Sequence, residues 1–278
     1  MKERKFRGVR AFTLIELLVV IAIIGMLLAV LIPALQYAKV QATAVICMAN
    51  LNGMSKAFVL YSEDNSGNLV GSGTEGWDAW QNQRRPAWDS SAGYQRVKNF
   101  VARPQAEDHS FRNSRLEDKI RGFQQGGLWP YTENAKLYHC PSDKRHLDQP
   151  TGINAPNEIG GYRTYSIGCV VNGYGIGDGW ATGEYYALIT KMGEFRTPAQ
   201  KIVFVEEQDG QGYNVNTWNI YLDDFTRWKG DPLACTHNER STMGYADGHA
   251  EKRHWVDETT IYLFENQIKW GDSRHRPY

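Results

Sequence analysis

The sequence predicts an α+β protein in which one long N-terminal helix packs on a small antiparallel β-sheet head that carries a loop-rich insertion. Two observations support this fold class. An uncharged apolar run over residues 17–38 continues as an amphipathic pattern to about residue 64, and short β-like runs bounded by turn residues follow in the C-terminal half. The 278 residues leave room for a membrane segment and one or two compact domains.

The charge distribution argues against a nucleic-acid partner. The chain has 31 basic and 31 acidic residues, but five of the bases and one of the acids lie in residues 1–11. The remainder therefore holds 26 bases and 30 acids, a net charge of −4. Binding to a phosphate backbone requires a basic excess, so we expect no nucleic acid.

The apolar run Leu17–Ala38 has the length of a membrane-spanning helix. Its 22 residues, at about 1.5 Å each, would cross a hydrocarbon core about 30 Å thick. The bases before it would stay in the cytoplasm by the positive-inside rule, which places the rest of the chain outside. A secretory signal peptide fits less well, because its apolar region has about 7–15 residues and precedes an A-x-A-like site. An ordinary membrane anchor is the other alternative.

Glu16 lies where the apolar run begins, and an ordinary anchor does not explain it. A carboxylate in lipid is costly unless it is paired, so intramembrane ionisable residues are functional candidates. Cleavage between Ala11 and Phe12 would create an α-amino group four residues before Glu16, about one helical turn away. The new amine could pair with Glu16 of the same chain or of a neighbouring copy.

The segment Arg10–Val20 resembles the cleavage and methylation signal of type IV pilins and type II secretion pseudopilins. The resemblance implies that a prepilin peptidase/N-methyltransferase cuts between Ala11 and Phe12 and N-methylates Phe12. It also implies that Glu16 sets the register between neighbouring subunits. Ala11 stands where the family usually has Gly, so we expect slower processing at worst.

The same resemblance has implications for fold, location and partners. Gly25 and Pro33 fall where pilin helices carry Gly and Pro, which implies a role in assembly, and such a Pro would kink or locally melt the helix. The implied fold is the pilin lollipop. The implied location is the bacterial inner membrane, with a single span, a cytoplasmic N-terminus, a periplasmic head, and association with a fibre after assembly. The implied partners are the peptidase, other copies or other pseudopilins, and an inner-membrane assembly platform.

These arguments divide the chain into four parts. We expect a cleaved leader at 1–11, a helix at 12–64 with its membrane segment at about 14–36, a Trp-containing insertion at 65–121 and a periplasmic β-rich head at 122–278. Beyond the membrane, apolar residues recur at spacings of three and four, which predicts a stem helix with one buried stripe. The stripe comprises Leu35, Ala38, Ala42, Val45, Met48, Leu51, Met54, Phe58 and Tyr61.

The insertion is polar and interrupted by Gly and Pro, but it contains Trp77, Trp80 and Trp88. These rings form either a small core of the insertion or an exposed platform for a glycan or a partner. The large area that aromatic side chains bury favours the core.

Short β-like runs follow in the head, at residues 162–171, 201–206, 217–222 and 242–246. The last run continues through Asp247-Gly248 into residues 249–255, in the form of a hairpin with a two-residue loop. A helix at 256–270 is a weaker prediction. These runs predict the antiparallel sheet of the head.

His237, followed by nine residues and then Asp247-Gly248, resembles the H-x9-DG segment at the end of one large group of prepilin-like proteins. The resemblance indicates kinship and implies no enzymatic role. We favour a structural role in which His237 braces the Asp247-Gly248 turn. A metal site at His237, Asp247 and His249, with bound calcium, and catalysis by these residues are the alternatives. We expect no cofactor or metal, because the sequence lacks a dense acidic loop and His is not a typical calcium ligand.

Four cysteines are too few for a disulfide-built scaffold, and none forms a C-x-x-C pair. If the head faces an oxidising periplasm, a disulfide between Cys47 and Cys140 would link the head to the stem. Buried or free thiols and other pairings, with Cys169 or Cys235, are the alternatives.

The leading functional hypothesis is a structural pilin-like or pseudopilin subunit of a fibre in a type II secretion or type IV pilus-like machine. The second is a minor tip subunit whose Trp-rich head binds a secreted substrate or a glycan. The third is a membrane-anchored enzyme of the envelope. It ranks last because no G-x-S-x-G, H-E-x-x-H, Walker or Rossmann signature is present, so we expect no enzymatic activity.

Overall fold

The described residues form the α+β fold that the sequence predicted, with a long apolar N-terminal helix and an antiparallel sheet in the head. The chain divides into two compact units, Met1–Ala42 and Thr43–Tyr278. The predicted helix at 256–270 lies outside the described residues. The computed structural model describes residues 13–75, 98–102, 104, 114–144, 147, 162–168, 171–172, 189–207, 217–218, 233–235, 237 and 240–255.

Helix α1 spans Leu14–Asp64 and contributes to both units. It runs without interruption through Pro33, so the expected local melting does not occur. Its end agrees with the prediction. Ser66 and Gly67 adopt left-handed backbone conformations with φ of 58° and 80°, and the Gly67 N–H donates to the Ser62 carbonyl at 2.7 Å. This bond satisfies one of the last free carbonyls and stops the helix.

The buried face of α1 in the head differs from the predicted stripe on its N-terminal side. Val45 is 58% exposed, whereas Ala44 and Cys47 are buried in its place. The predicted stripe advanced in steps of three residues from Ala42 to Met54. Each such step falls about 60° short of a full helical turn, so the stripe rotates around the helix and its N-terminal residues lie off the buried face. The true face alternates steps of three and four: Ala44, Cys47, Leu51, Met54, Phe58 and Tyr61.

Four antiparallel strands form the main sheet, in the order β3-β4-β5-β6. They confirm four of the predicted β-runs. In the remaining run, 217–222, only residues 217 and 218 are described, and Trp218 forms an isolated bridge with Gly168. The strands span Tyr165–Ile167 (β3), Ile202–Glu206 (β4), Arg240–Tyr245 (β5) and Ala250–His254 (β6).

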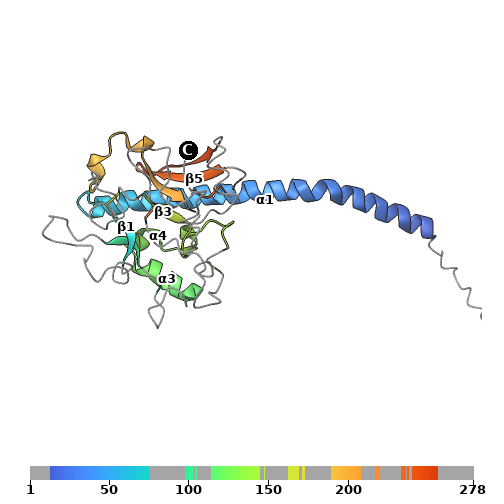
Figure 1. Cartoon of the computed structure of the whole chain (residues 1–278), viewed down its shortest axis with the longest axis horizontal. Coiled ribbons are helices and arrows are strands. Elements are labelled where there is room, and N and C mark those ends of the chain that lie inside the picture. The colour runs from blue at the N-terminus through green and yellow to red at the C-terminus, as the bar shows by residue number, and fades with distance from the viewer. Residues whose placement is uncertain are drawn as a thin grey trace, which may run out of the picture. The chain divides into compact units, whose positions relative to one another are not determined.

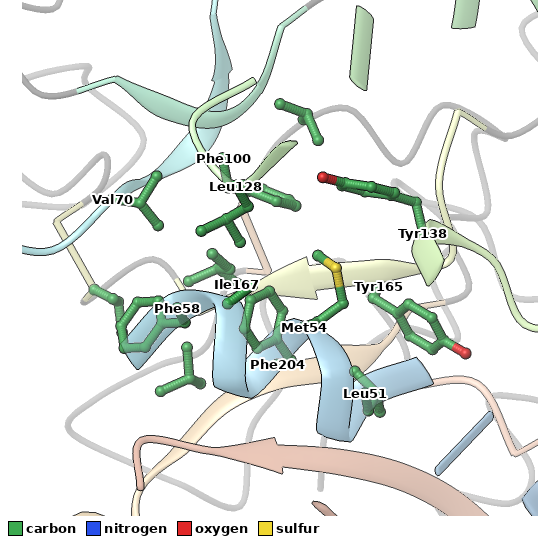
Figure 2. Packing of buried hydrophobic residues seen from close by; sticks show 14 of the residues in the cluster. Leu51, Met54, Phe58, Val70, Phe100, Leu128, Tyr138, Tyr165, Ile167 and Phe204 are labelled. Atoms are coloured by element: carbon green, nitrogen blue, oxygen red, sulfur yellow. The ribbon is translucent and has the colours of Figure 1, made fainter. Parts of the chain in front are cut away.

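The sheet lies directly against the stem part of α1 (Figure 1). A Cβ on Gly244 of β5 would lie 2.2 Å from the Ser55 hydroxyl oxygen and 3.5 Å from the Leu51 carbonyl oxygen, so a larger residue would require Ser55 to shift. The main core fills this interface. In Figure 2, Leu51, Met54 and Phe58 of the helix lie beside Ile167 and Phe204 of the sheet.

The β5–β6 hairpin has a three-residue loop rather than the predicted two-residue loop. The Tyr245 N–H donates to the His249 carbonyl at 2.9 Å, which leaves residues 246–248 as the loop. The Gly248 N–H donates to the Tyr245 carbonyl at 3.1 Å, and Gly248 has φ of 95°. A three-residue hairpin places a left-handed residue at its last position, so the Asp-Gly pair fills the second and third loop positions.

The predicted loop-rich insertion contains secondary structure that the sequence pattern did not indicate. Strand β1, Gly71–Glu75, pairs in parallel with β2, Asn99–Ala102, and helix α3 follows at Leu116–Gln125. Phe100 and Val101 of β2 are fully buried, so this part of the insertion belongs to the head core. Strands this short show too few alternations to be recognised. The described residues also form α4 at Trp129–Thr132 and the 3-10 helices η2 at Ala135–Tyr138, η5 at Met192–Glu194 and η6 at Pro198–Gln200.

Candidate functional site

The first candidate site is the apolar surface of α1 within the N-terminal unit. The large apolar side chains from Leu14 to Leu35 are all exposed, and even the least exposed of them, Val20, is 45% exposed. Of the described part of the chain, α1 is the helix long and apolar enough to cross a membrane. Removing one large apolar side chain from water is worth about 1.5–3 kcal/mol, so this surface requires lipid or neighbouring helices around it.

Glu16 completes a capping box at the start of α1. The Thr13 backbone N–H and hydroxyl both donate to Glu16 Oε2 at 2.8 Å, and the Glu16 N–H lies 3.3 Å from the Thr13 hydroxyl oxygen. A Thr followed three residues later by Glu satisfies otherwise free N–H groups of the first turn. This cap was not predicted from the sequence, although the spacing of Thr13 and Glu16 signals it. Ala11 and Phe12 lie outside the described residues, so their cleavage stays a prediction.

Gly25 and Pro33, the other two predicted assembly residues, lie within the exposed part of α1. A Cβ on Gly25 would meet nothing within 4 Å, so no contact within the described chain requires Gly there. Small residues let neighbouring helices approach closely in membranes. The assembly role of both residues stays a prediction.

The second candidate site is a buried cluster in the head, formed by Cys47, Cys140, Glu206 and His237. Their two sulfurs, one carboxylate oxygen and one imidazole nitrogen all lie within 4.8 Å of one another, and all four residues are buried. Cys47 comes from α1, Cys140 follows η2, Glu206 ends β4 and His237 precedes β5. The fold therefore brings together donor atoms from four segments that are far apart in the sequence.

Hydrogen bonds fix how the cluster residues point. Glu206 Oε1 lies 3.1 Å from His237 Nε2 and 2.5 Å from Cys47 Sγ. The other oxygen, Oε2, accepts a hydrogen bond from the Thr242 backbone N–H at 2.9 Å. His237 Nε2 also lies 3.3 Å from Cys140 Sγ. One oxygen, one nitrogen and both sulfurs thus face a common centre, and the backbone holds the second oxygen away from it.

Contacts within the cluster shift the pKa values of three of its members. Burial raises the pKa of Cys47 far above its ordinary value. The hydrogen bond with Cys47 lowers the pKa of Cys140 to about 6, against the opposing effect of burial. Burial lowers the pKa of His237, but hydrogen bonds with Cys140 and Glu206 outweigh it and raise that pKa to about 9.

Three of the four cluster residues were candidates from the sequence, whereas Glu206 and its neighbour Tyr165 were not. These two residues are cross-strand partners in β4 and β3, and both are fully buried. The Tyr165 hydroxyl lies 2.8 Å from Cys47 Sγ. The sequence did contain a signal for Glu206, because this acid directly follows the apolar run 202–205. Burial of an unpaired charge there would be costly, so the position indicates a carboxylate with a partner.

The structure brings the predicted disulfide partners Cys47 and Cys140 together, but as two thiols. Cys235 is also buried, and its Sγ lies 3.8 Å from the Ser241 hydroxyl oxygen. Cys169 lies outside the described residues. The disulfide stays a prediction.

The structure puts His237 in the buried cluster rather than on the Asp247-Gly248 turn. Its backbone N–H donates to the Arg240 carbonyl at 3.3 Å, and its Nε2 faces the cluster. Its Nδ1 is buried and has no hydrogen-bond partner among the described residues. The expected brace between His237 and the turn is therefore not among the contacts that the structure describes.

The turn is organised by its own residues and by α1. The His249 N–H donates to Asp247 Oδ1 at 3.1 Å, and His249 Nδ1 lies 2.5 Å from the same oxygen. The Asn52 side-chain amide of α1 donates to the Gly248 carbonyl at 3.4 Å. The predicted trio is thus divided between the buried cluster, which holds His237, and the hairpin turn, which holds Asp247 and His249.

Trp77, Trp80 and Trp88 lie outside the described residues. The choice between a small aromatic core and a binding platform in the insertion therefore stays a matter of prediction.

Comparisons with known proteins bear on the N-terminal segment. A family model described as the prokaryotic N-terminal methylation motif matches residues 6–32. Over 60 residues the chain is 48% identical to the type IV wide pilus major component PilA4 of Thermus thermophilus, a match that covers 22% of this chain and 46% of that protein. The chain thus spans about half the length of the curated relative that it matches. No solved structure matches the chain.

These matches support a prepilin-type protein, as the segment Arg10–Val20 indicated. They agree with membrane anchoring through α1. The kinship that we inferred from the H-x9-DG segment stays a prediction.

Proposed function

We propose that this chain is a structural subunit of a helical fibre in a type II secretion or type IV pilus-like machine. The observation that carries the proposal is the coincidence of the methylation motif at residues 6–32 with the exposed apolar surface of α1. Cleavage between Ala11 and Phe12 and N-methylation of Phe12 by a prepilin peptidase would make α1 the first element of the mature chain. Packing of many such helices would bury their apolar surfaces together.

The position of Glu16 supports this assembly. Its capping box holds the carboxylate at the N-terminus of α1, close in sequence to the α-amine that cleavage would create at Phe12. An unpaired carboxylate in an apolar bundle is costly, whereas a pair with the α-amine of the same or a neighbouring copy neutralises both charges. The pair would therefore fix the axial register between subunits.

Before assembly, the proposed subunit crosses the bacterial inner membrane once. The five bases of residues 1–11 favour a cytoplasmic N-terminus, which places the head in the periplasm. Its proposed partners are the prepilin peptidase/N-methyltransferase, other copies or other pseudopilins, and the inner-membrane assembly platform.

Mass spectrometry of the N-terminus of the protein from its own cells tests the processing step. We expect mature material that begins at a singly methylated Phe12. Mature protein that retains Met1 or Lys2 would overturn the prepilin processing that we propose.

Glu16 variants separate its charge from its cap. Gln also serves in a capping box, so Glu16→Gln keeps the cap and removes the charge, whereas Thr13→Val weakens the cap and keeps the charge. We expect sheared fibres to be lost in Glu16→Gln and Glu16→Ala and retained in Thr13→Val, with equal amounts of each chain in the membrane fraction. Normal fibres from Glu16→Gln would contradict charge pairing. Loss of fibres in Thr13→Val alone would show that assembly depends on the cap rather than on the charge.

A further inference from the structure

We propose that Cys47, Cys140, His237 and Glu206 form a structural zinc site that ties the stem part of α1 to the sheet of the head. The inference does not depend on the proposed fibre function, because the site lies within the head unit and away from the methylation motif.

The donor set fits zinc better than other common metals. Structural zinc sites are tetrahedral, closed by four protein ligands, and built from thiolates and imidazoles with an occasional carboxylate. Two sulfurs, one nitrogen and one oxygen meet here. Calcium takes six to eight oxygen ligands, and the cluster offers one. Thiolates also disfavour magnesium and manganese.

Two of the three donor-to-donor distances come close to those of a tetrahedral zinc site. Zinc binds sulfur at about 2.3 Å and nitrogen or oxygen at about 2.0–2.2 Å, so neighbouring donor atoms should lie about 3.3–3.8 Å apart. His237 Nε2 lies 3.3 Å from Cys140 Sγ and 3.1 Å from Glu206 Oε1, and all donor pairs are within 4.8 Å. The 2.5 Å between Cys47 Sγ and Glu206 Oε1 would have to lengthen by about 1 Å to reach that range.

Surrounding hydrogen bonds orient these ligands, as outer partners do in metal sites. The Thr242 N–H occupies Glu206 Oε2, which leaves Oε1 as a single-oxygen ligand. The Tyr165 hydroxyl lies against Cys47 Sγ at 2.8 Å and can stabilise its thiolate.

The Cys140 backbone is anchored as well. Its N–H donates to the Thr164 hydroxyl oxygen at 3.1 Å, and that hydroxyl donates to Asp143 Oδ2 at 2.7 Å. The chain that presents the Cys140 sulfur is therefore held in position without using any of the four donor atoms.

Two other arrangements would use the same atoms. A disulfide between Cys47 and Cys140 would engage two of the four residues and leave His237 and Glu206 as a buried pair. A hydrogen-bonded cluster without a metal would keep both thiols. Zinc accounts for the convergence of all four donors, because each of them then binds the same ion.

Elemental analysis of the full chain, purified in detergent and exposed to zinc chloride before gel filtration, tests the site. We expect one zinc per chain in the unaltered protein and in Cys235→Ser, the matched control, whose thiol is buried outside the cluster. Cys140→Ser and Glu206→Gln each remove one of the four ligands that a structural site requires, so we expect them to lose most of the zinc.

A second measurement needs no variant and therefore does not depend on whether the variants fold. Cobalt(II) bound in place of zinc should show sulfur-to-cobalt charge transfer and the intense visible bands of tetrahedral coordination. The proposal is overturned by zinc no higher than the buffer blank, by full retention of zinc in Cys140→Ser, or by octahedral cobalt spectra. It is also overturned if peptide mapping under non-reducing conditions recovers Cys47 linked to Cys140 in the zinc-exposed chain.

Discussion

Truncation of Phe58 to Ala tests whether the stem part of α1 is the centre of the head core. Phe58 is fully buried, and its ring packs edge-on against Phe195 at 6.4 Å and Phe204 at 6.1 Å. Loss of a buried Phe side chain costs about 3–5 kcal/mol. The two edge-to-face pairs place Phe58 in the upper part of that range, so we expect a loss of about 4–5 kcal/mol. A domain is stable by only about 5–15 kcal/mol, so the effect is large.

Urea unfolding of the full chain in detergent, followed by tryptophan fluorescence, measures this loss. Leu60→Ala is the matched control, since Leu60 lies on the same helix two residues away but is 46% exposed. We expect the control to change the free energy of unfolding by less than about 1 kcal/mol. If Phe58→Ala and Leu60→Ala differed by less than about 1 kcal/mol, the assigned buried face of α1 would be wrong.

Two further predictions concern the β5–β6 hairpin. Gly244→Ala would place a Cβ 2.2 Å from the Ser55 hydroxyl oxygen and 3.3 Å from Phe204 Cβ. We therefore expect it to lower the free energy of unfolding in urea by about 1–3 kcal/mol. Gly193→Ala is the control, because a Cβ on Gly193 would meet nothing within 4 Å. Equal unfolding midpoints for the two variants would contradict this contact. Burial raises the pKa of Asp247, but hydrogen bonds from His249 outweigh it and leave that pKa below its ordinary value. The ionised Asp247 carboxylate therefore stabilises the fold above its unfolded pKa, and this stabilisation is lost as pH falls through its folded pKa. We expect Asp247→Asn to flatten the acid side of a plot of thermal midpoint against pH. Superimposable acid sides for the variant and the unaltered protein would exclude the effect.

The two candidate sites differ in how far the sequence could predict them. Glu16 was recognisable from a short stretch of sequence, because an acid at the start of an apolar run is unusual and the methylation motif around it is contiguous. The buried cluster was not recognisable, because Cys47 and Glu206 are 159 positions apart. Cys140 and His237 were noted for other roles, a disulfide and a turn brace, since nothing local indicates which partners they meet.

By itself, the sequence determined the features that depend on neighbouring residues. The long apolar helix, its end at Asp64, four of the strands and the prepilin-type signal all follow from short-range periodicity, turn residues and one contiguous motif. The tertiary structure decided which face of α1 is buried, the three-residue loop at Asp247-Gly248 and the convergence of Cys47, Cys140, Glu206 and His237. Each of these depends on strand register or on helix–sheet contact between distant segments, and such long-range pairing is absent from local sequence patterns.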